Sequence, residues 1–351
     1  PFTGFLEKII SERQVTKFMK TLIFLPYFGK RPAYFNLWLH SCGYQQDFDW
    51  LILTDHPLPC PPPDNVNVIQ CTLSELKQQF QKKTDLPLSL EKPYKLCDYK
   101  PFYGYFLSEH LDGYDYWGYC DCDLIFGNIR KYLTRQIQTG YDKCIRTGHF
   151  SVIRNSMAVN NVFMKYETRK IVLTSPVVYG YDETVNGYHP GFTGELIREG
   201  FTFTDLEEVI ADIDFRHFPF YEIHRFGGPF IYLYERGKLY RLCYEKGTPV
   251  KEECMYIHLQ KRHMHVEPGI DPEHFIICPN RFVRYPEAFQ KHDCLLIGET
   301  LWTQSNQEKF GYFNRPKEKL LNVYRDFRRL LYEPNKIDSL LYRNKKGNDQ
   351  K

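Results

Sequence analysis

The first hundred residues alternate between short apolar runs and segments whose apolar positions recur at helical spacing. Residues 21–26 and 49–55 are apolar runs that end in Pro or Asp, which is typical of strands buried in a sheet. Between them, apolar residues recur every three or four positions from Tyr34 to Cys42, which predicts a helix. Strands and helices in alternation predict an α/β fold with a mostly parallel sheet flanked by helices.

The alternation continues toward the middle of the chain. Residues 65–70 read as a third strand. Thr72, followed three residues later by Glu75, forms a capping box that opens a helix reaching about Lys83. The pattern further predicts helices over 102–111 and 157–167 and strands near 141–146 and 149–154.

No linker, repeat or low-complexity segment divides the chain. Met19 begins a segment that reads like a natural start, so residues 1–18 are interpreted as an N-terminal extension. Residues 19–300 are expected to form one α/β domain. Residues 301–351 are expected to form a C-terminal helical segment with a basic tail.

Composition narrows the classes of function. Of 351 residues, 17% are aromatic, which suits a large core and also sites that stack on bases or sugars. A net charge of +3 is too small to indicate nucleic acid as a partner. No apolar run approaches the ~20 residues of a spanning helix. The 11 cysteines form no CxxC pair, and without an export signal they predict reduced thiols and a cytoplasmic location.

The stretch Tyr114–Gly127 reads as a buried strand that ends in two carboxylates, Asp121 and Asp123. Residues two apart on a strand share a face, and ligands of an open parallel sheet bind beyond the carboxyl ends of its strands. A pair of carboxylates there suits Mg²⁺ or Mn²⁺, whose open positions can bind phosphates. A short Asp-x-Asp pattern also occurs as a solvated turn, but the apolar residues on both sides favour a cation site.

The segment 91–133, which contains both aspartates, resembles a family of bacterial GT-A-type glycosyltransferases from capsule and surface-polysaccharide loci. The likeness continues through 22–56, 148–155 and 256–262, and so covers most of the chain. It implies a GT-A, Rossmann-like fold and a nucleotide-sugar donor, for which UDP is the expected nucleotide. It also implies that the two aspartates bind the metal. The resemblance leaves the transferred sugar open.

Three residues that follow the first two strands are candidates for binding the nucleotide. By the resemblance, the loop after the first strand lies along the nucleotide, so Tyr27 could stack on a base and Lys30 could contact a phosphate. Asp55 ends the second strand on the same side and could bond a ribose or a base. The structural alternatives are an ordinary surface lysine at Lys30 and a turn capped by Asp55.

The residues just before the strand that carries the acids offer two further candidates. By the resemblance this segment packs near the nucleotide, with Asp98 and Lys100 contacting base, ribose or phosphate. If 94–100 is helical, Lys95 and Asp98 share a face and could instead form a structural ion pair.

A histidine from a late segment completes the metal site in many enzymes of this kind, and His258 is the candidate here. It follows the apolar residues of a strand-like approach, whereas His263 and His265 compete from the same stretch. Lys261 is placed to contact the diphosphate. Neutral imidazole suits Mn²⁺ better than Mg²⁺, so Mn²⁺ is the preferred cofactor.

An inverting transferase needs a carboxylate that takes the proton of the acceptor hydroxyl, and Asp182 and Glu183 are the candidates. The alternative is a plain turn, because glycines flank the pair. A retaining enzyme needs no such base, and the sequence does not decide between the two outcomes. Gly148 allows close backbone approach, and His149 or Arg154 could contact the donor, contact the acceptor or be structural.

The C-terminal segment carries an apolar stripe formed by Leu320, Tyr324, Phe327 and Leu331. Such a stripe most often docks on the domain. The basic residues around it and the basic tail could instead rest on anionic lipid at the inner face of the membrane. That placement would suit a lipid-linked acceptor.

Together the resemblance and the motifs predict a metal-dependent glycosyltransferase that moves a sugar from a nucleotide-diphosphate donor to a surface-polysaccharide or lipid-linked glycan. One alternative is another metal-dependent enzyme acting on nucleotides or phosphates, although 25–30 is not a Gly-rich phosphate loop. The other is a non-catalytic glycan-binding relative, against which the intact acids argue.

Overall fold

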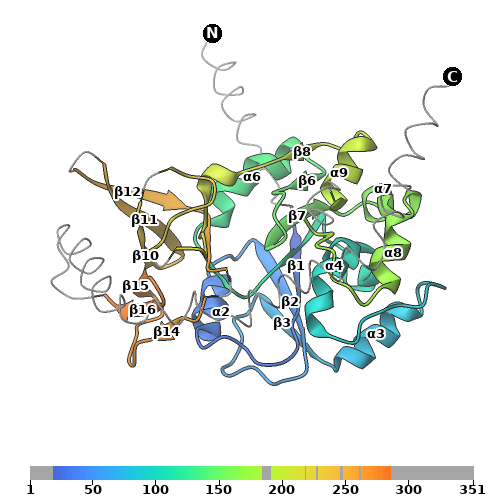
Figure 1. The fold of residues 1–351 in the computed structure, drawn as a ribbon, viewed down its shortest axis with the longest axis horizontal. Helices are drawn as coiled ribbons and strands as arrows, with labels where there is room; N and C mark the ends of the chain where they lie inside the picture. Colours follow the sequence, from blue (N-terminus) through green and yellow to red (C-terminus); the bar gives the residue numbers. More distant parts are fainter. Residues whose placement is uncertain are drawn as a thin grey trace, which may run out of the picture.

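The computed structural model describes residues 19–183, 191–217, 219–226, 228–245, 248–260 and 262–285. Its centre is a seven-stranded sheet in the order β3-β2-β1-β4-β7-β6-β8 (Figure 1). The first four strands in this order run parallel, and β7 is antiparallel to both β4 and β6. The predicted mixed α/β fold with a mostly parallel sheet is confirmed. The strands are β1 Thr21–Pro26, β2 Phe48–Thr54, β3 Val66–Gln70, β4 Tyr116–Cys120, β6 Lys143–Cys144, β7 Phe150–Arg154 and β8 Phe203–Thr204.

Helices cover both faces of this sheet, so its central strands are apolar on both sides. In β1, Ile23 and Leu25 pack into one core, while Leu22 and Phe24 pack into the other. Helices α2 and α6 pack on the first face, and α3, α4 and α7–α9 on the second. The helices are α2 Phe35–Gly43, α3 Leu73–Gln81, α4 Leu96–Tyr99, α5 Tyr103–Phe106, α6 Ile129–Thr139, α7 Met157–Asn160, α8 Thr168–Thr174 and α9 Gly191–Arg198.

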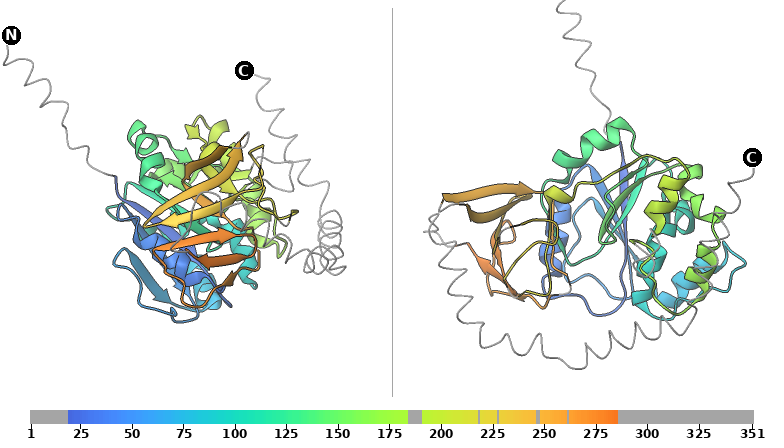
Figure 2. Two further views of the ribbon diagram at one scale, coloured as in Figure 1. Left: turned by 90° about the vertical axis from the view of Figure 1, so that its left-hand side faces the viewer. Right: turned by 45° about the horizontal axis from the view of Figure 1, so that its top comes forward.

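Two smaller sheets complete the described fold. A six-stranded sheet, in the order β12-β11-β10-β15-β16-β14, stands beside α2 and does not extend the central sheet (Figure 2). The Tyr34 ring packs on Phe282 of β16, and Tyr44 packs on Tyr234 of β10, which joins this sheet to α2. Its strands are β10 Ile231–Glu235, β11 Lys238–Glu245, β12 Thr248–Cys254, β14 His265–Val266, β15 His274–Cys278 and β16 Arg281–Arg284.

The third sheet has the order β5-β13-β9 and positions the candidate site. It comprises β5 Leu124–Phe126, β9 Ile210–Asp212 and β13 Tyr256–His258. Strand β13 is antiparallel to β5 and parallel to β9, so His258 lies opposite both Leu124 and Asp212. The start of β5 and the ends of β9 and β13 therefore lie side by side, although they are far apart in the sequence.

Several local predictions are confirmed and others fall outside the described residues. Thr72 and Glu75 make both hydrogen bonds of the capping box at α3. The predicted extension 1–18 and the C-terminal segment 301–351, with its apolar stripe, lie outside the described residues. Among the described residues, no helix is long and apolar enough to cross a membrane. Within the described ranges, the free thiols include those of Cys42, Cys60, Cys71, Cys97, Cys120, Cys122, Cys144, Cys254 and Cys278.

Glu195 of α9 gives the fold a pH dependence that can be tested. Its side chain is fully buried and accepts a hydrogen bond from the Tyr181 hydroxyl. Burial raises the pKa of Glu195 to about 8. Because this pKa is raised on folding, the stability that the neutral form contributes is complete below pH ~4.5 and is lost as the pH rises through about 8. Glu195→Gln should therefore be more stable than the unaltered chain at pH 9, by roughly 5 kcal/mol, with the gap closing toward pH 5.

Glu199, one turn later, is the matched control. Lys165 and Tyr166 bond its carboxylate and lower its pKa, so its contribution is present at high pH and is lost as the pH falls. Glu199→Gln should thus destabilise at pH 9 and become neutral at low pH. Melting temperatures of the three proteins from pH 5 to 9 should show a pH-dependent gain for Glu195→Gln and a constant loss for Glu199→Gln, whose titration lies below pH ~4.5. A pH-independent difference for Glu195→Gln would contradict the assignment.

Candidate functional site

Asp121 and Asp123 lie where the central sheet meets the small sheet. The Asp121 N–H donates to His149 O at 2.8 Å and so extends the β4–β7 ladder by one residue. Asp123 O accepts from the Leu259 N–H at 2.9 Å, just beyond β13. Cys122 between them is buried in the core, as the alternation of a strand predicts. The two acids are thus fixed by different sheets.

His258 reaches the second of these acids from β13. Its Nε2 lies 3.6 Å from Asp123 Oδ1, and its Nδ1 lies 2.7 Å from Asp212 Oδ1. Burial alone would lower the pKa of His258, but the Asp123 charge and the bonds to both carboxylates raise it to about 10. The carboxylates therefore favour positive charge at this position. Of the histidines considered from the sequence, His258 is buried, whereas His263 and His265 are exposed.

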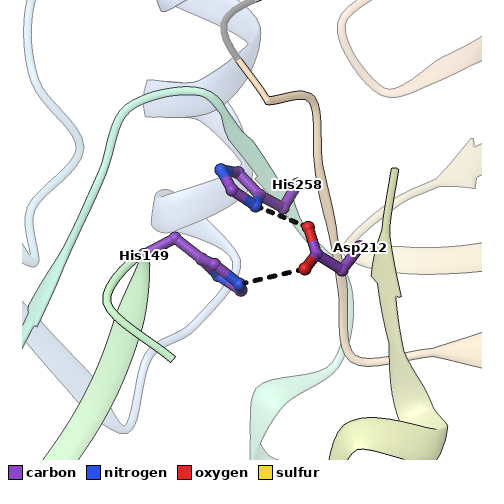
Figure 3. A group of neighbouring side chains, drawn as sticks. All are labelled: His149, Asp212 and His258. Carbon is purple, nitrogen blue, oxygen red and sulfur yellow. Dashed lines mark hydrogen bonds and ion pairs between the residues drawn. The ribbon is translucent and has the colours of Figure 1, made fainter. Parts of the chain in front are cut away.

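His149 packs against His258 as a buried neighbour. The two rings are stacked, with centroids 3.9 Å apart and planes at 27°. His149 Nδ1 lies 3.2 Å from the Tyr256 hydroxyl. Its Nε2 lies 3.8 Å from Asp212 Oδ2, and Figure 3 shows His149 and His258 both facing the Asp212 carboxylate. Burial, together with the neighbouring His258, holds the pKa of His149 well below its usual value. The ligand atoms of His149, Asp212 and His258 lie within 4.8 Å of one another, so this group could bind a metal ion.

Lys100 joins Asp121 to Asp182. Its Nζ lies 2.7 Å from Asp121 Oδ1 and 3.3 Å from Asp182 Oδ2, and it donates to Gly148 O at 2.7 Å. Burial alone would lower the pKa of Lys100, but the charges of the two acids raise it well above its usual value. Burial raises the pKa of Asp182 to about 7, although Lys100 opposes that shift. The Lys100 ammonium is thus held by protein oxygens.

Asp98 organises the loop that carries Asp182. It is fully buried, pairs with Lys95 Nζ at 2.7 Å and accepts from the backbone N–H groups of Tyr179, Gly180 and Tyr181. These contacts engage both carboxylate oxygens. This placement favours the structural ion pair over a nucleotide contact for Asp98.

Gly148 explains how Asp182 fits beneath the site. A Cβ on Gly148 would lie 2.4 Å from Asp182 Oδ2, closer than any tolerated contact, so the close approach predicted from the sequence is made by that carboxylate. The Gly148 N–H donates to Glu183 Oε1 at 2.9 Å. Glu183 itself is exposed. The two base candidates therefore differ, one buried and one facing solvent. Arg154 pairs with Asp142 at 3.4 Å, away from both.

The loop after β1 lies beside the Asp-x-Asp motif. The pKa of Tyr27 is raised by burial, and by Cys122 and Asp123, which places its hydroxyl next to that motif. The same hydroxyl donates to Lys30 O at 2.9 Å. Asp55 accepts from the Gly29 N–H at 3.0 Å, a capping contact that ties this loop to the end of β2. Lys30 is exposed, and Lys261 lies outside the described residues.

Asp212 is the residue of the site that the sequence reasoning missed. A signal for it exists, because Asp212 and Asp214 repeat the two-residue spacing of the first pair of acids and also follow apolar residues. Asp214 pairs with Arg216 at 2.6 Å, whereas Asp212 bonds His258. His149 was considered as a contact to donor or acceptor but not as a partner of these two residues.

Comparison with known proteins gives one family match. The model of a family of unknown function, DUF6625, matches residues 23–286. No curated protein matches the sequence.

Two solved structures show weak likeness. Mouse xyloside xylosyltransferase 1 in its apo form has a TM-score of 0.32 and 8% identity, over 56% of this chain and 88% of that chain. The apo-form glycosyltransferase GlyE of Streptococcus pneumoniae TIGR4 has a TM-score of 0.30 and 12% identity, over 55% of this chain and 46% of that chain. Scores of this size do not bear on the fold or the activity.

Proposed function

We propose that this chain, which belongs to the family of unknown function DUF6625, is a metal-dependent glycosyltransferase. Its donor is a nucleotide-diphosphate sugar, with UDP as the expected nucleotide. The observation that carries the proposal is the approach of Asp123 and His258 from two strands, with their ligand atoms 3.6 Å apart, beside Asp121. Carboxylate and imidazole ligands on strand ends leave the remaining positions of a cation open to a diphosphate.

The residues fit a divalent cation. Two atoms that bind the same ion at roughly 2.1–2.2 Å lie about 3–4 Å apart, depending on the angle between them, and the observed 3.6 Å falls in that range. The carboxylates that raise the pKa of His258 stabilise a positive charge at this position, and they would stabilise a metal ion in the same way. The mixed oxygen and nitrogen ligands favour Mn²⁺ over Mg²⁺.

Each residue then has a distinct task. A bound cation would neutralise the leaving diphosphate as the glycosidic bond breaks. Lys100 holds Asp121 in place and keeps Asp182 close to it. In an inverting reaction, Asp182 is the proposed base, because a pKa of about 7 suits proton transfer near neutral pH, and exposed Glu183 is the alternative. Tyr27 and Lys30 remain the proposed nucleotide contacts.

The proposed acceptor is a surface polysaccharide or a lipid-linked glycan, which follows from the family resemblance. Phe215 and Phe226 are exposed in the segment that follows Asp212, and exposed aromatic faces suit sugar rings. The same segment contacts the site, since His224 Nε2 lies 4.0 Å from Asp212 Oδ2. A cytoplasmic location at the inner face of the membrane would place the enzyme near such an acceptor.

Thermal melting with UDP and Mn²⁺ tests the proposal. We expect UDP and Mn²⁺ together to raise the melting temperature by several degrees, because a ligand at 100 times its Kd stabilises by about 2.7 kcal/mol. Either component alone should act much more weakly. Stabilisation by glycans without nucleotide would indicate a lectin, and stabilisation by nucleoside triphosphates in preference to UDP would indicate another phosphate-handling enzyme. A screen of nucleotide sugars for metal-dependent hydrolysis would then identify the donor.

A further inference from the structure

His258 has a carboxylate at each of its two ring nitrogens. Asp123 faces Nε2 at 3.6 Å, and Asp212 faces Nδ1 at 2.7 Å. A neutral imidazole offers a lone pair at one nitrogen and a proton at the other. A metal ion can therefore use Nε2 with Asp123, or Nδ1 with Asp212 and His149, but not both at once.

We propose that Asp212 is a positioning residue that holds the Nδ1–H of His258 and so directs Nε2 toward the metal at Asp121 and Asp123. This inference rests on the proposed function, because it assigns a role toward the same cation. Buried acceptors that fix a metal-bound histidine in this way are a general feature of metal sites. Asp212 and His149 then lie beside His258 without being ligands of the ion.

The distances around Asp212 favour a hydrogen bond over metal ligation. A separation of 2.7 Å is that of a charge-assisted hydrogen bond and is shorter than the roughly 3 Å or more between two ligands of one ion. Asp212 Oδ1 also accepts from Gln260 Nε2 at 3.0 Å, so two donors already converge on this oxygen. The pairing of β9 with β13 places Asp212 directly opposite His258.

The orientation of the His149 ring also argues against a metal ion bound between His149, Asp212 and His258. Its ring is stacked nearly face to face on His258, at 27° and 3.9 Å. The lone pairs of an imidazole lie in the plane of its ring, so two nearly parallel stacked rings direct their nitrogens side by side and not toward one point. Nδ1 of His149 is also engaged by the Tyr256 hydroxyl. His149 thus packs against the site and is not oriented to bind the metal.

Mn²⁺ affinity of the full chain tests this inference without any donor or acceptor. Free Mn²⁺ measured by electron paramagnetic resonance at pH 7.5 gives the Kd of each variant. We expect Asp212→Asn to weaken Mn²⁺ binding by about 10–100-fold. Asp214→Asn, a carboxylate two residues along with its own arginine partner, is the matched control and should change the Kd by less than about threefold. His149→Gln should also leave the Kd nearly unchanged.

The outcomes separate this inference from the proposed function. If Asp123→Asn weakens Mn²⁺ binding but Asp212→Asn does not, Asp212 has no positioning role and the proposed function stands. A loss in His149→Gln as large as that in Asp212→Asn would assign the metal to the buried group instead. No Mn²⁺ binding by the unaltered chain, or none lost in Asp123→Asn, overturns both proposals.

A spectroscopic readout distinguishes positioning from general support of the fold. Long-range ¹H–¹⁵N spectra with diamagnetic Zn²⁺ should show His258 with its proton on Nδ1 in the unaltered chain and in Asp214→Asn. In Asp212→Asn that signature should weaken or mix with the other tautomer, while the melting curve stays cooperative. An unchanged tautomer in Asp212→Asn would contradict the inference.

Discussion

Asp123→Ala should reduce metal-dependent donor turnover by at least about 10³-fold while the chain stays folded. The substitution removes the carboxylate that faces His258 Nε2 at 3.6 Å and so removes a ligand of the proposed cation. Loss of the charge that a metal supplies to a leaving group amounts to several kcal/mol, and each 1.4 kcal/mol is tenfold in rate. Turnover is measured as release of nucleoside diphosphate from the donor found in the hydrolysis screen.

The melting temperature and the turnover of Asp123→Ala have to be measured separately, so that a loss of folding is not mistaken for a loss of catalysis. The Asp123 side chain is 19% exposed, so water can reach the vacated position and the melting temperature should stay within a few degrees of the unaltered chain. Asp214→Asn controls for the loss of a carboxylate near the same strand ends. Unchanged turnover in a folded Asp123→Ala protein would eliminate the mechanism, because no other described carboxylate faces His258 Nε2 in this arrangement.

The parts of the site that depend on local pattern could be predicted from the sequence. Asp121 and Asp123 follow an apolar strand, and the register of β4 explains why both leave the sheet at its carboxyl edge. His258 was chosen over its neighbours because it ends an apolar run, and that run is β13. The arrangement of these residues was not predictable, since it is set by pairing between segments more than a hundred residues apart.

Residues whose role depends on distant partners could not be assigned in this way. Asp98 and Lys100 are close in sequence, yet one holds the 179–181 backbone and the other joins Asp121 to Asp182. The proposed role of Asp212 depends on its contact with His258, which lies 46 residues later in the sequence. The predicted helix over 102–111 also forms as short turns and not as one helix, since α5 ends at Phe106 and a separate turn follows over Ser108–His110. These contacts between distant residues cannot be predicted from the local sequence.

Lys100→Met should destabilise the fold strongly, because Lys100 pairs with a buried carboxylate. It leaves Asp182 buried without its cationic partner, and breaking a buried pair by removing one side costs about 3–5 kcal/mol. Most of this loss is assigned to Asp182, because the Asp121 side chain is 37% exposed and water can replace part of its interaction. Lys165→Met, which breaks a surface pair with Glu199, should cost no more than about 1 kcal/mol.

Two further measurements test whether the lost charge pair causes this effect. Without Lys100 the pKa of Asp182 rises further, so the stability of the variant should be lost as the pH rises, and its deficit in urea unfolding should shrink between pH 8 and pH 5. The double variant Lys100→Met/Asp182→Asn removes the buried charge and should recover much of the stability at pH 8. If the deficit is the same at every pH and the second substitution adds to it, the loss comes from packing of the lysine stem, and Lys100 does not hold the two acids together by charge.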